Sequence, residues 1–420
     1  MKKHILTLLI FLSLFFYGRT AQILIPMDNT QTNHLKAYGI AYFVLENDVT
    51  IEWLLNYRGG AFLTPHLSRI EDELIIRGVS YEVLADGQVN AIKKEIASPE
   101  ANMDVVQLEV APKIAVYSPP GTQPWDDAVT MVMEFAEIPY DVVYDSIVLA
   151  GGLAEYDWLH LHHEDFTGQY GKFYAAYRNA PWYRQQVADM EASAKRLGFE
   201  KVSQMKLAVA ESIKSYVYAG GFLFTMCSGA DSFDVALAAH NTDIAEHMYD
   251  GDGIDPDFAS KLDFNNTLAF HNFQIKENPL EYEYSTIDGT HLHRNVPEEE
   301  DMFTLFEFSA KWDVIPTMLT QSHKRVIKNF YGQTTDFIKD YIKPEIIILG
   351  ESKNINTAKY IHGTHGEGTF TFYGGHDPED YQHRVGDPDT DLSLHPNSPG
   401  YRLILNNVLF PAAKKKKRKT

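Results

Sequence analysis

Residues 220–234 read GGFLFTMCSGADSFD, and this stretch decides the fold that the sequence predicts. Residues 222–226 form an apolar, β-prone run after two glycines, and Cys227, the single cysteine of the chain, follows directly. Ser228 and Gly229 favour a tight turn, and residues with helical spacing come next. A strand, a sharp turn that carries a thiol and a helix are the parts of a nucleophile elbow, in which the helix N-terminus favours a thiolate. A small buried residue at the end of a core strand is the alternative interpretation.

The composition indicates a folded, acidic protein. The chain has 420 residues, of which 45% are hydrophobic and 13% aromatic, and this is enough for two or three domains with cores of their own. The formal net charge of −20 argues against a nucleic-acid partner. One cysteine allows no internal disulfide, and a free thiol in an oxidising compartment has to be buried or used.

The first 21 residues predict a secretory signal peptide. Lys2 and Lys3 form a basic start, residues 5–17 are apolar but too short for a membrane span, and the predicted cleavage point follows Ala21. We therefore expect a periplasmic or secreted protein that does not span a membrane after the signal is removed. The basic end, residues 413–420, is expected to be a solvated tail.

The remaining chain predicts a small α/β unit followed by a larger one. Residues 22–110 alternate strand-like and helix-like runs. Residues 111–242 show a strand–helix–strand pattern with parallel spacing, and residues 346–412 resume it after an inserted α+β segment at 243–345. The predicted fold class is α/β, with a doubly wound, mostly parallel sheet. Ligands of such sheets bind beyond the carboxyl ends of the strands.

Catalytic candidates lie at that predicted edge of the sheet. Cys227 is the candidate nucleophile, and His376, which ends an apolar strand after two glycines, is the candidate base. Glu379 is the candidate carboxylate that orients the imidazole.

The same edge carries the predicted binding residues. His162, His163 and Glu164 follow another strand, and Ser228 and Gly229 follow the cysteine. The amide of Ser228 and the loop at 162–168 are the predicted oxyanion donors.

A cysteine on a strand–turn–helix elbow, followed late in the chain by a strand that ends in histidine and a nearby glutamate, resembles the class I glutamine amidotransferase-like domains. The resemblance covers residues 112–242 and 345–410, and it implies a flavodoxin-like fold and hydrolysis or transfer at an amide or acyl group of a small molecule or peptide. Cys227 matches the family's nucleophile, His376 its base and Glu379 its acid. The spacing here is H-x-x-E where the family has H-x-E, and HHEDFTGQYG replaces the family's glycine-rich oxyanion loop.

A resemblance over the whole chain is to secreted proteins of Bacteroidetes-type bacteria that carry the label asparagine synthetase B. The matching stretches are HLKAYGIAYFVL, WLLNYRGGAFL, LHHEDFTGQYGKF, MCSGADSF, GHDPEDYQHRVGDP and NNVLFPAAKKKKRKT. Residues 228–232, SGADS, are one residue short of the ATP-binding S-G-G-x-D-S loop of enzymes with that name, and no cofactor is predicted.

Two other functions stay open at this point. The same fold could serve as a non-catalytic binding module in which Cys227 is structural. Alternatively, the histidine-rich rim, to which His162, His163 and His376 belong, could bind zinc in a metal-dependent hydrolase. Hydrogen-bonded rim histidines are the favoured interpretation, and no metal ligand is predicted.

Overall fold

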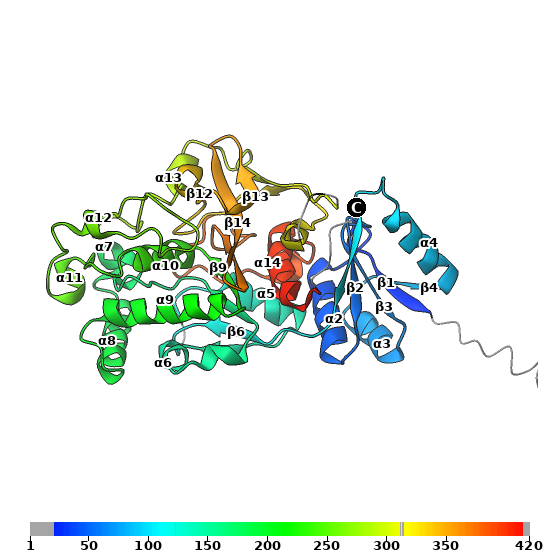
Figure 1. Ribbon diagram of the computed structural model, residues 1–420, viewed down its shortest axis with the longest axis horizontal. Helices are drawn as coiled ribbons and strands as arrows, with labels where there is room; N and C mark the ends of the chain where they lie inside the picture. Colours follow the sequence, from blue (N-terminus) through cyan, green and yellow to red (C-terminus); the bar gives the residue numbers. More distant parts are fainter. Residues whose placement is uncertain (1–20, 122, 311, 313–314, 415–420) are drawn as a thin grey trace, which may run out of the picture.

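The computed structural model describes residues 21–121, 123–310, 312 and 315–414, which form two β-sheets flanked by helices (Figure 1). The predicted signal peptide, except Ala21, and the basic tail beyond Lys414 lie outside the described residues. Within these ranges, no helix is both long and apolar enough to cross a lipid bilayer.

The first sheet belongs to the N-terminal unit at one end of the molecule, and all its strand pairs are antiparallel (Figure 1). In spatial order its strands are β4 (Glu82–Leu84), β1 (Gln22–Ile25), β3 (Ala61–Pro65), β2 (Ile51–Leu55) and β5 (Asp104–Leu108). The helices of this unit are α2 (His34–Glu46), α3 (Ser68–Ile76) and α4 (Asp86–Ala97).

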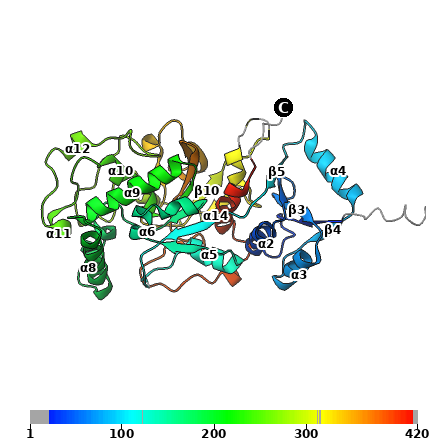
Figure 2. The same ribbon diagram turned by 60° about the horizontal axis from the view of Figure 1, so that its bottom comes forward.

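Helix α2 connects the N-terminal unit to the rest of the protein. The side chain of Asn33 caps the helix by accepting a hydrogen bond from Lys36 N over 2.9 Å. The helix packs against α5 (Ala128–Ala136) and α14 (Pro399–Leu409), which lie between the two sheets (Figure 2). A Cβ on Gly39 would lie 1.8 Å from Ala136 O, so this glycine allows α2 and α5 to touch backbone to backbone. One hydrophobic core therefore continues from the first sheet into the second.

The second sheet begins with a parallel half. Its strands, in spatial order, are β7 (Asp141–Val143), β6 (Ile114–Tyr117), β8 (Trp158–Leu161), β9 (Phe222–Met226) and β15 (Gly368–Tyr373). Alternate residues of β9 face different cores: Leu223 packs in one cluster with Val209 of α9 (Val202–Tyr218), and Phe224 packs in the cluster of α5 and α14. Helices thus cover both faces of the parallel half, as in a doubly wound sheet.

Beyond β15 the same sheet becomes antiparallel. This half contains β14 (Thr357–His365), β13 (Ile347–Ser352), β10 (Met302–Leu305) and β11 (Val326–Lys328), and β12 (Phe337–Ile338) also pairs with β14. The sheet is therefore mixed, and the prediction of a mostly parallel sheet describes only its first half. The connections from β13 to β14 and from β14 to β15 are short turns, and strands joined by short turns pair antiparallel. The predicted insertion contributes β10, β11 and β12 to the sheet itself.

The remaining elements are short, apart from α8 and α10. They are α6 (Asp145–Leu149), α7 (Tyr174–Tyr177), α8 (Pro181–Arg196), α10 (Ser228–Ala238), α11 (His247–Asp250), α12 (Phe258–Lys261), α13 (Thr290–His293) and the 3₁₀ turns η1 (Gly152–Glu155), η2 (Tyr170–Lys172), η3 (Ile315–Thr320), η4 (Lys339–Tyr341), η5 (Leu392–Leu394) and η6 (Phe410–Ala412).

Candidate functional site

The carboxyl ends of three neighbouring parallel strands bring the chemistry-bearing residues together. Strands β8, β9 and β15 lie side by side with β9 in the middle. His162 and His163 follow β8, Cys227 follows β9, and His376 comes shortly after β15. The prediction that these residues share one edge of the sheet is confirmed, since parallel strands end at a common edge.

Cys227 occupies a strained elbow between β9 and α10. Its backbone has φ 52° and ψ −138°, a conformation that residues with a Cβ rarely adopt. The residue is 2% exposed and sits directly before the first turn of α10. The strand, the strained thiol and the helix give the local geometry of a nucleophile elbow.

Three backbone amides face the sulfur of Cys227. The amide of Gln333 donates to Sγ over 3.2 Å, and the amides of Thr334 and Ser228 also favour negative charge on the sulfur. Burial nevertheless raises the pKa of the Cys227 thiol above its ordinary value, against the effect of these amides. The thiol is therefore protonated in the resting protein at neutral pH.

The backbone amides around the sulfur differ in part from the predicted oxyanion donors. The amide of Ser228 faces the sulfur as expected, but the other two belong to the loop at 329–336. Of the predicted loop at 162–168, His163 alone lines the cavity at the site, and the amide of Thr167 is bonded to a carboxylate within the loop itself. The amide of Phe166 is bonded to Ser232 Oγ over 3.4 Å, so neither of these two amides is free to bind an oxyanion.

The loop at 329–336 packs tightly over the cysteine. A Cβ on Gly332 would lie 2.9 Å from Cys227 Sγ and 2.9 Å from His376 N. The amide of His376 donates to Tyr331 O over 2.9 Å, which ties the loop to the end of β15. The sequence alone contained one signal for this contact, the glycine at 332, but no indication of its partner.

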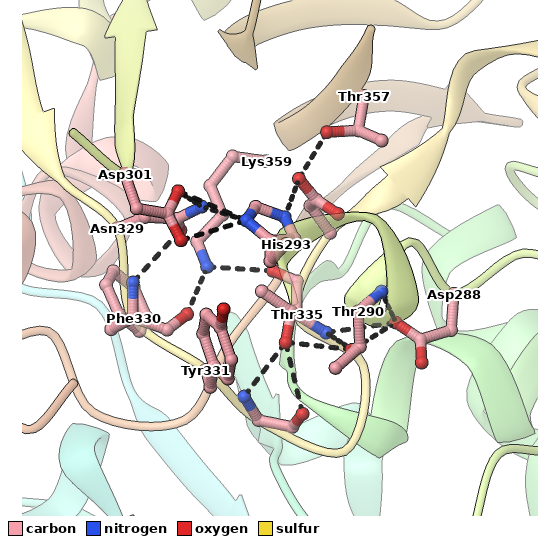
Figure 3. A network of polar contacts seen from close by, with 12 residues as sticks. Asp288, Thr290, His293, Asp301, Asn329, Phe330, Tyr331, Thr335, Thr357 and Lys359 are labelled. Carbon is pink, nitrogen blue, oxygen red and sulfur yellow. Dashed lines mark hydrogen bonds and ion pairs between the residues drawn. The ribbon is translucent and has the colours of Figure 1, made fainter. Parts of the chain in front are cut away.

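A buried polar network holds the two ends of this loop (Figure 3). Lys359 Nζ donates to Phe330 O over 2.6 Å and to Thr335 O over 2.8 Å. The amide of Thr335 donates to Asp288 over 3.2 Å. Burial lowers the pKa of Lys359 to about 7, so this ammonium group is close to losing its charge at neutral pH.

His293 anchors the same network between two carboxylates (Figure 3). Its Nδ1 lies 3.0 Å from Asp301 and its Nε2 lies 2.8 Å from Asp336, which also accepts a hydrogen bond from Thr357. Burial disfavours the imidazolium, but the two carboxylates outweigh burial and raise the pKa of His293 to about 9. The loop is thus positioned by charged, buried hydrogen bonds, and its amides are oriented before any ligand binds.

Histidines and one carboxylate form a second polar group beside the cysteine. The ring centroids of His162 and His163 are 3.7 Å apart, those of His163 and His376 are 4.5 Å apart, and those of His376 and His383 are 4.2 Å apart. Asp126 Oδ1 lies 3.3 Å from His383 Nε2 and 3.7 Å from His376 Nε2. We call these five residues the histidine cluster.

Most polar atoms of the histidine cluster make no hydrogen bond to any described residue. These atoms are Nε2 of His162, both ring nitrogens of His376, both carboxylate oxygens of Asp126, and Nε2 of His383. His163 differs, since its Nε2 bonds Asp126 O over 2.8 Å. Buried polar groups are nearly always paired, so a concentration of unpaired ones at one place marks a candidate functional site.

The imidazoles of His162, His163 and His376 are neutral at physiological pH. Burial lowers the pKa of His162, and it lowers the pKa of His163 and His376 far below the ordinary range, with neighbouring histidines adding to the effect. Asp127, which lies 3.4 Å from His162 Nδ1, opposes the shift of His162. Burial raises the pKa of Asp126 to about 7, although His383 opposes the shift.

Glu379 does not contact His376, which it was predicted to orient. Its carboxylate lies 3.1 Å from His395 Nδ1. A tight turn, closed by the amide of Asp380 on Asp377 O over 3.2 Å, directs Glu379 away from the imidazole. Asp126 is the carboxylate within ion-pair distance of His376 instead.

Glu164 and Gly229, two of the predicted binding residues, also make contacts other than the predicted ones. Glu164 does not line the cavity; its backbone oxygen accepts a hydrogen bond from Ser232 over 2.8 Å, and burial raises the pKa of its carboxyl to about 7. Gly229 donates its amide to His162 O over 2.8 Å, and a Cβ there would lie 2.6 Å from that oxygen. This glycine therefore allows α10 to approach the loop after β8.

Cys227 and three members of the histidine cluster, His163, His376 and His383, line one cavity of about 390 Å³. Its wall combines aromatic side chains with charged ones, from the loop before α5 and from the segments near residues 290 and 384. The lining includes Trp125, Phe173, Tyr282, Glu283, Arg294 and Arg384. A cavity of this size and mixed polarity is typical of a small-molecule site.

The fold and the site define a mixed α/β protein with a cysteine elbow beside a buried histidine cluster. No protein-family model matches the chain, and no curated protein matches it. Among solved structures, the cytoplasmic proteins STM3548 from Salmonella typhimurium and STM1381 from Salmonella typhimurium LT2 are 11% and 13% identical, with TM-scores of 0.33 and 0.36, and each alignment covers 72% of this chain and 100% of the other. The β-galactosidase Gan42B is 10% identical with a TM-score of 0.26, over 64% of this chain and 28% of the enzyme. Similarities of this extent define neither a family nor a function.

Proposed function

We propose that this protein is an extracytoplasmic, thiol-dependent hydrolase or transferase that acts on the amide or acyl group of a small molecule or peptide, with a fold and chemistry like those of class I glutamine amidotransferases. One observation carries the proposal: Cys227 lies in a strained elbow, with three backbone amides around its sulfur, at the wall of a cavity that also contains His376. Residues held in such strained conformations cluster at active sites and ligand-binding sites.

The reaction follows from the groups around the sulfur. Cys227 Sγ attacks the carbonyl carbon while its proton passes to a ring nitrogen of His376, and the amides of Ser228, Gln333 and Thr334 beside the sulfur are the proposed donors to the oxyanion. The proton then goes to the leaving amine, and a thioester remains on Cys227. Water, or another acceptor, takes the acyl group and restores the thiol.

His376 is the base in this proposal because its two ring nitrogens have no other hydrogen-bond partner in the described chain. Asp126 takes the orienting role that the sequence assigned to Glu379, since its carboxylate lies 3.7 Å from His376 Nε2. Burial keeps the pKa of His376 low and that of Cys227 high, so the resting pair is a neutral thiol and a neutral imidazole. We therefore expect the proton to move only together with attack on a bound substrate.

The test combines thiol labelling across pH with a panel of amides and activated acyl esters. Cys227→Ala should abolish release of amine or alcohol, and His376→Asn should lower kcat at least about 100-fold, as for loss of a general base. Lys94→Ala, an exposed change in α4, is the matched control and should leave the rate unchanged. Turnover that survives in Cys227→Ala would exclude the thiol mechanism. A thiol that reacts identically in wild type and in His376→Asn at every pH would favour a non-catalytic binding module of the same fold.

A further inference from the structure

The histidine cluster contains a set of ligands without a cation. Asp126, His376 and His383 each offer one atom, and these three atoms lie within 4.8 Å of one another. The shortest separation is 3.3 Å, between Asp126 Oδ1 and His383 Nε2. Ligands of a tetrahedral zinc ion are separated by similar distances, since the bonds to nitrogen and oxygen are about 2.0–2.2 Å long.

Buried polar atoms of this triad make no hydrogen bonds to the part of the chain that the structure describes, and they face one another across ion-pair distances. Both oxygens of Asp126, both ring nitrogens of His376 and Nε2 of His383 have no hydrogen-bond partner among the residues described. Asp126 is 8% exposed and His376 is 6% exposed, so solvent does not satisfy them freely. Each unpaired buried group costs about 1–3 kcal/mol. A single cation between the three side chains removes this cost for the one atom that each of them contributes.

The surroundings fit the outer layer of a metal site. The second ring nitrogen of His383 lies 3.1 Å from Asp380, and histidine ligands usually donate that N–H to a carboxylate. The backbone oxygen of Asp126 accepts a hydrogen bond from His163 over 2.8 Å, which holds the loop that carries the carboxylate. The amide of Gly386 donates to Pro124 O over 3.0 Å, and this bond joins the two loops that meet at the triad.

We propose that Asp126, His376 and His383 bind one first-row divalent transition-metal ion, of which Zn²⁺ is the best match. Two imidazoles and one carboxylate suit Zn²⁺ and disfavour Mg²⁺ and Ca²⁺, which prefer sets of oxygen ligands. His376 and His383 both line the cavity, so a fourth position of the ion faces the space where a substrate binds. Three protein ligands and one open position are the arrangement of catalytic rather than structural zinc.

The metal site does not rest on the thiol mechanism. A ring nitrogen of His376 that binds an ion cannot accept the proton of Cys227 at the same time. The proton transfer proposed above therefore belongs to the metal-free protein, and the loaded protein has a different centre in the same cavity. The two proposals have separate measurements, because metal binding is read without turnover.

The experiment is a Zn²⁺ titration of the chelator-treated full chain, followed by calorimetry and by elemental analysis after gel filtration. One ion per chain with a Kd below about 1 µM is expected, and Asp126→Asn and His383→Gln should each weaken binding about 10–100-fold or more. His395→Ala, a partly exposed histidine that pairs with Glu379, is the matched control and should bind zinc like wild type. Cys227→Ala should also bind zinc normally, so failure of the thiol mechanism and failure of the metal site remain distinguishable.

Substitution with Co²⁺ gives a second readout, which does not depend on affinity. The intense visible bands of four-coordinate Co²⁺ should appear in wild type and in His395→Ala and be lost in His376→Gln, with circular dichroism to verify that each variant is folded. Absence of stoichiometric zinc in wild type would overturn the proposal. Zinc that binds equally well to all three ligand variants would overturn it too, since binding would then take place elsewhere.

Discussion

Replacing Gly332 with alanine tests whether the loop at 329–336 is fitted against the cysteine. The new Cβ would lie 2.9 Å from three heavy atoms, Cys227 Sγ, Gly375 C and His376 N, where ordinary contacts are 3.4–4 Å. Two of the three are backbone atoms and cannot rotate away. Overpacking of this kind costs about 1–3 kcal/mol, and the lower chain entropy of alanine in the unfolded state returns about 0.4–1 kcal/mol. We expect a net loss of roughly 1–2 kcal/mol in the free energy of unfolding.

The matched control is Gly253→Ala. No atom lies within 4 Å of a Cβ at Gly253, and neither glycine has a φ in the left-handed range. The control should therefore be neutral or slightly stabilising, opposite in sign to Gly332→Ala. Urea unfolding measures both, and labelling of Cys227 by a small neutral thiol reagent reports whether the Gln333 amide has moved from the sulfur. If Gly332→Ala were as stable as Gly253→Ala and its labelling rate unchanged, the close contact between loop and thiol would be refuted.

Three further changes test other parts of the structure. Because φ is 52° at Cys227, Cys227→Gly should be at least as stable to urea as Cys227→Ala, since release of about 1–3 kcal/mol of strain offsets the usual glycine cost; an alanine variant more stable by about 1 kcal/mol would contradict the strain. Lys206→Met leaves the buried carboxylate of Asp145 without its cation and should cost about 3–5 kcal/mol in thermal unfolding, with partial recovery on adding Asp145→Asn; equal stability of the single and double variants would argue against the pair. The pKa of His293 is raised from 6.5 to about 9, so its stabilisation is fully present below pH 6.5 and is lost as the pH rises through 9. The difference in unfolding free energy between wild type and His293→Gln should therefore shrink between about pH 6 and pH 10. Lys359, whose pKa is lowered to about 7, makes the unfolding free energy rise with pH, but this contribution is present in both proteins and cancels in the difference. A difference that does not depend on pH would sink the assignment.

The local elements of the fold were predictable because their signals are local. The run at 222–226 is a strand, the positions after Cys227 form a helix, and alternate strand residues face different cores. The antiparallel half of the second sheet was missed, because a strand pattern shows that a segment is extended but not which neighbour it pairs with. The short turns before and after β14 were the sequence feature that could have indicated antiparallel pairing.

The candidate site was predictable in part for the same reason. Cys227 and His376 could be placed at one edge because each follows a predicted parallel strand. The partner of His376 was not predictable, since Glu379 is near in sequence but Asp126 is near in space. Sequence distance misleads wherever a tight turn directs a side chain away from its neighbour.

The sequence by itself determined the order of elements at the elbow, because a β-prone run, a lone thiol and a glycine turn before a helix are local signals. Only the tertiary structure decided what surrounds the thiol. The amides of Gln333 and Thr334 arrive from a segment that the sequence marked as an insertion, and Asp126 meets His383 across more than half of the chain. The physical reason is that the order of strands in the sheet sets which loops share its edge, and strand order is fixed by the packing of the whole core rather than by any single stretch.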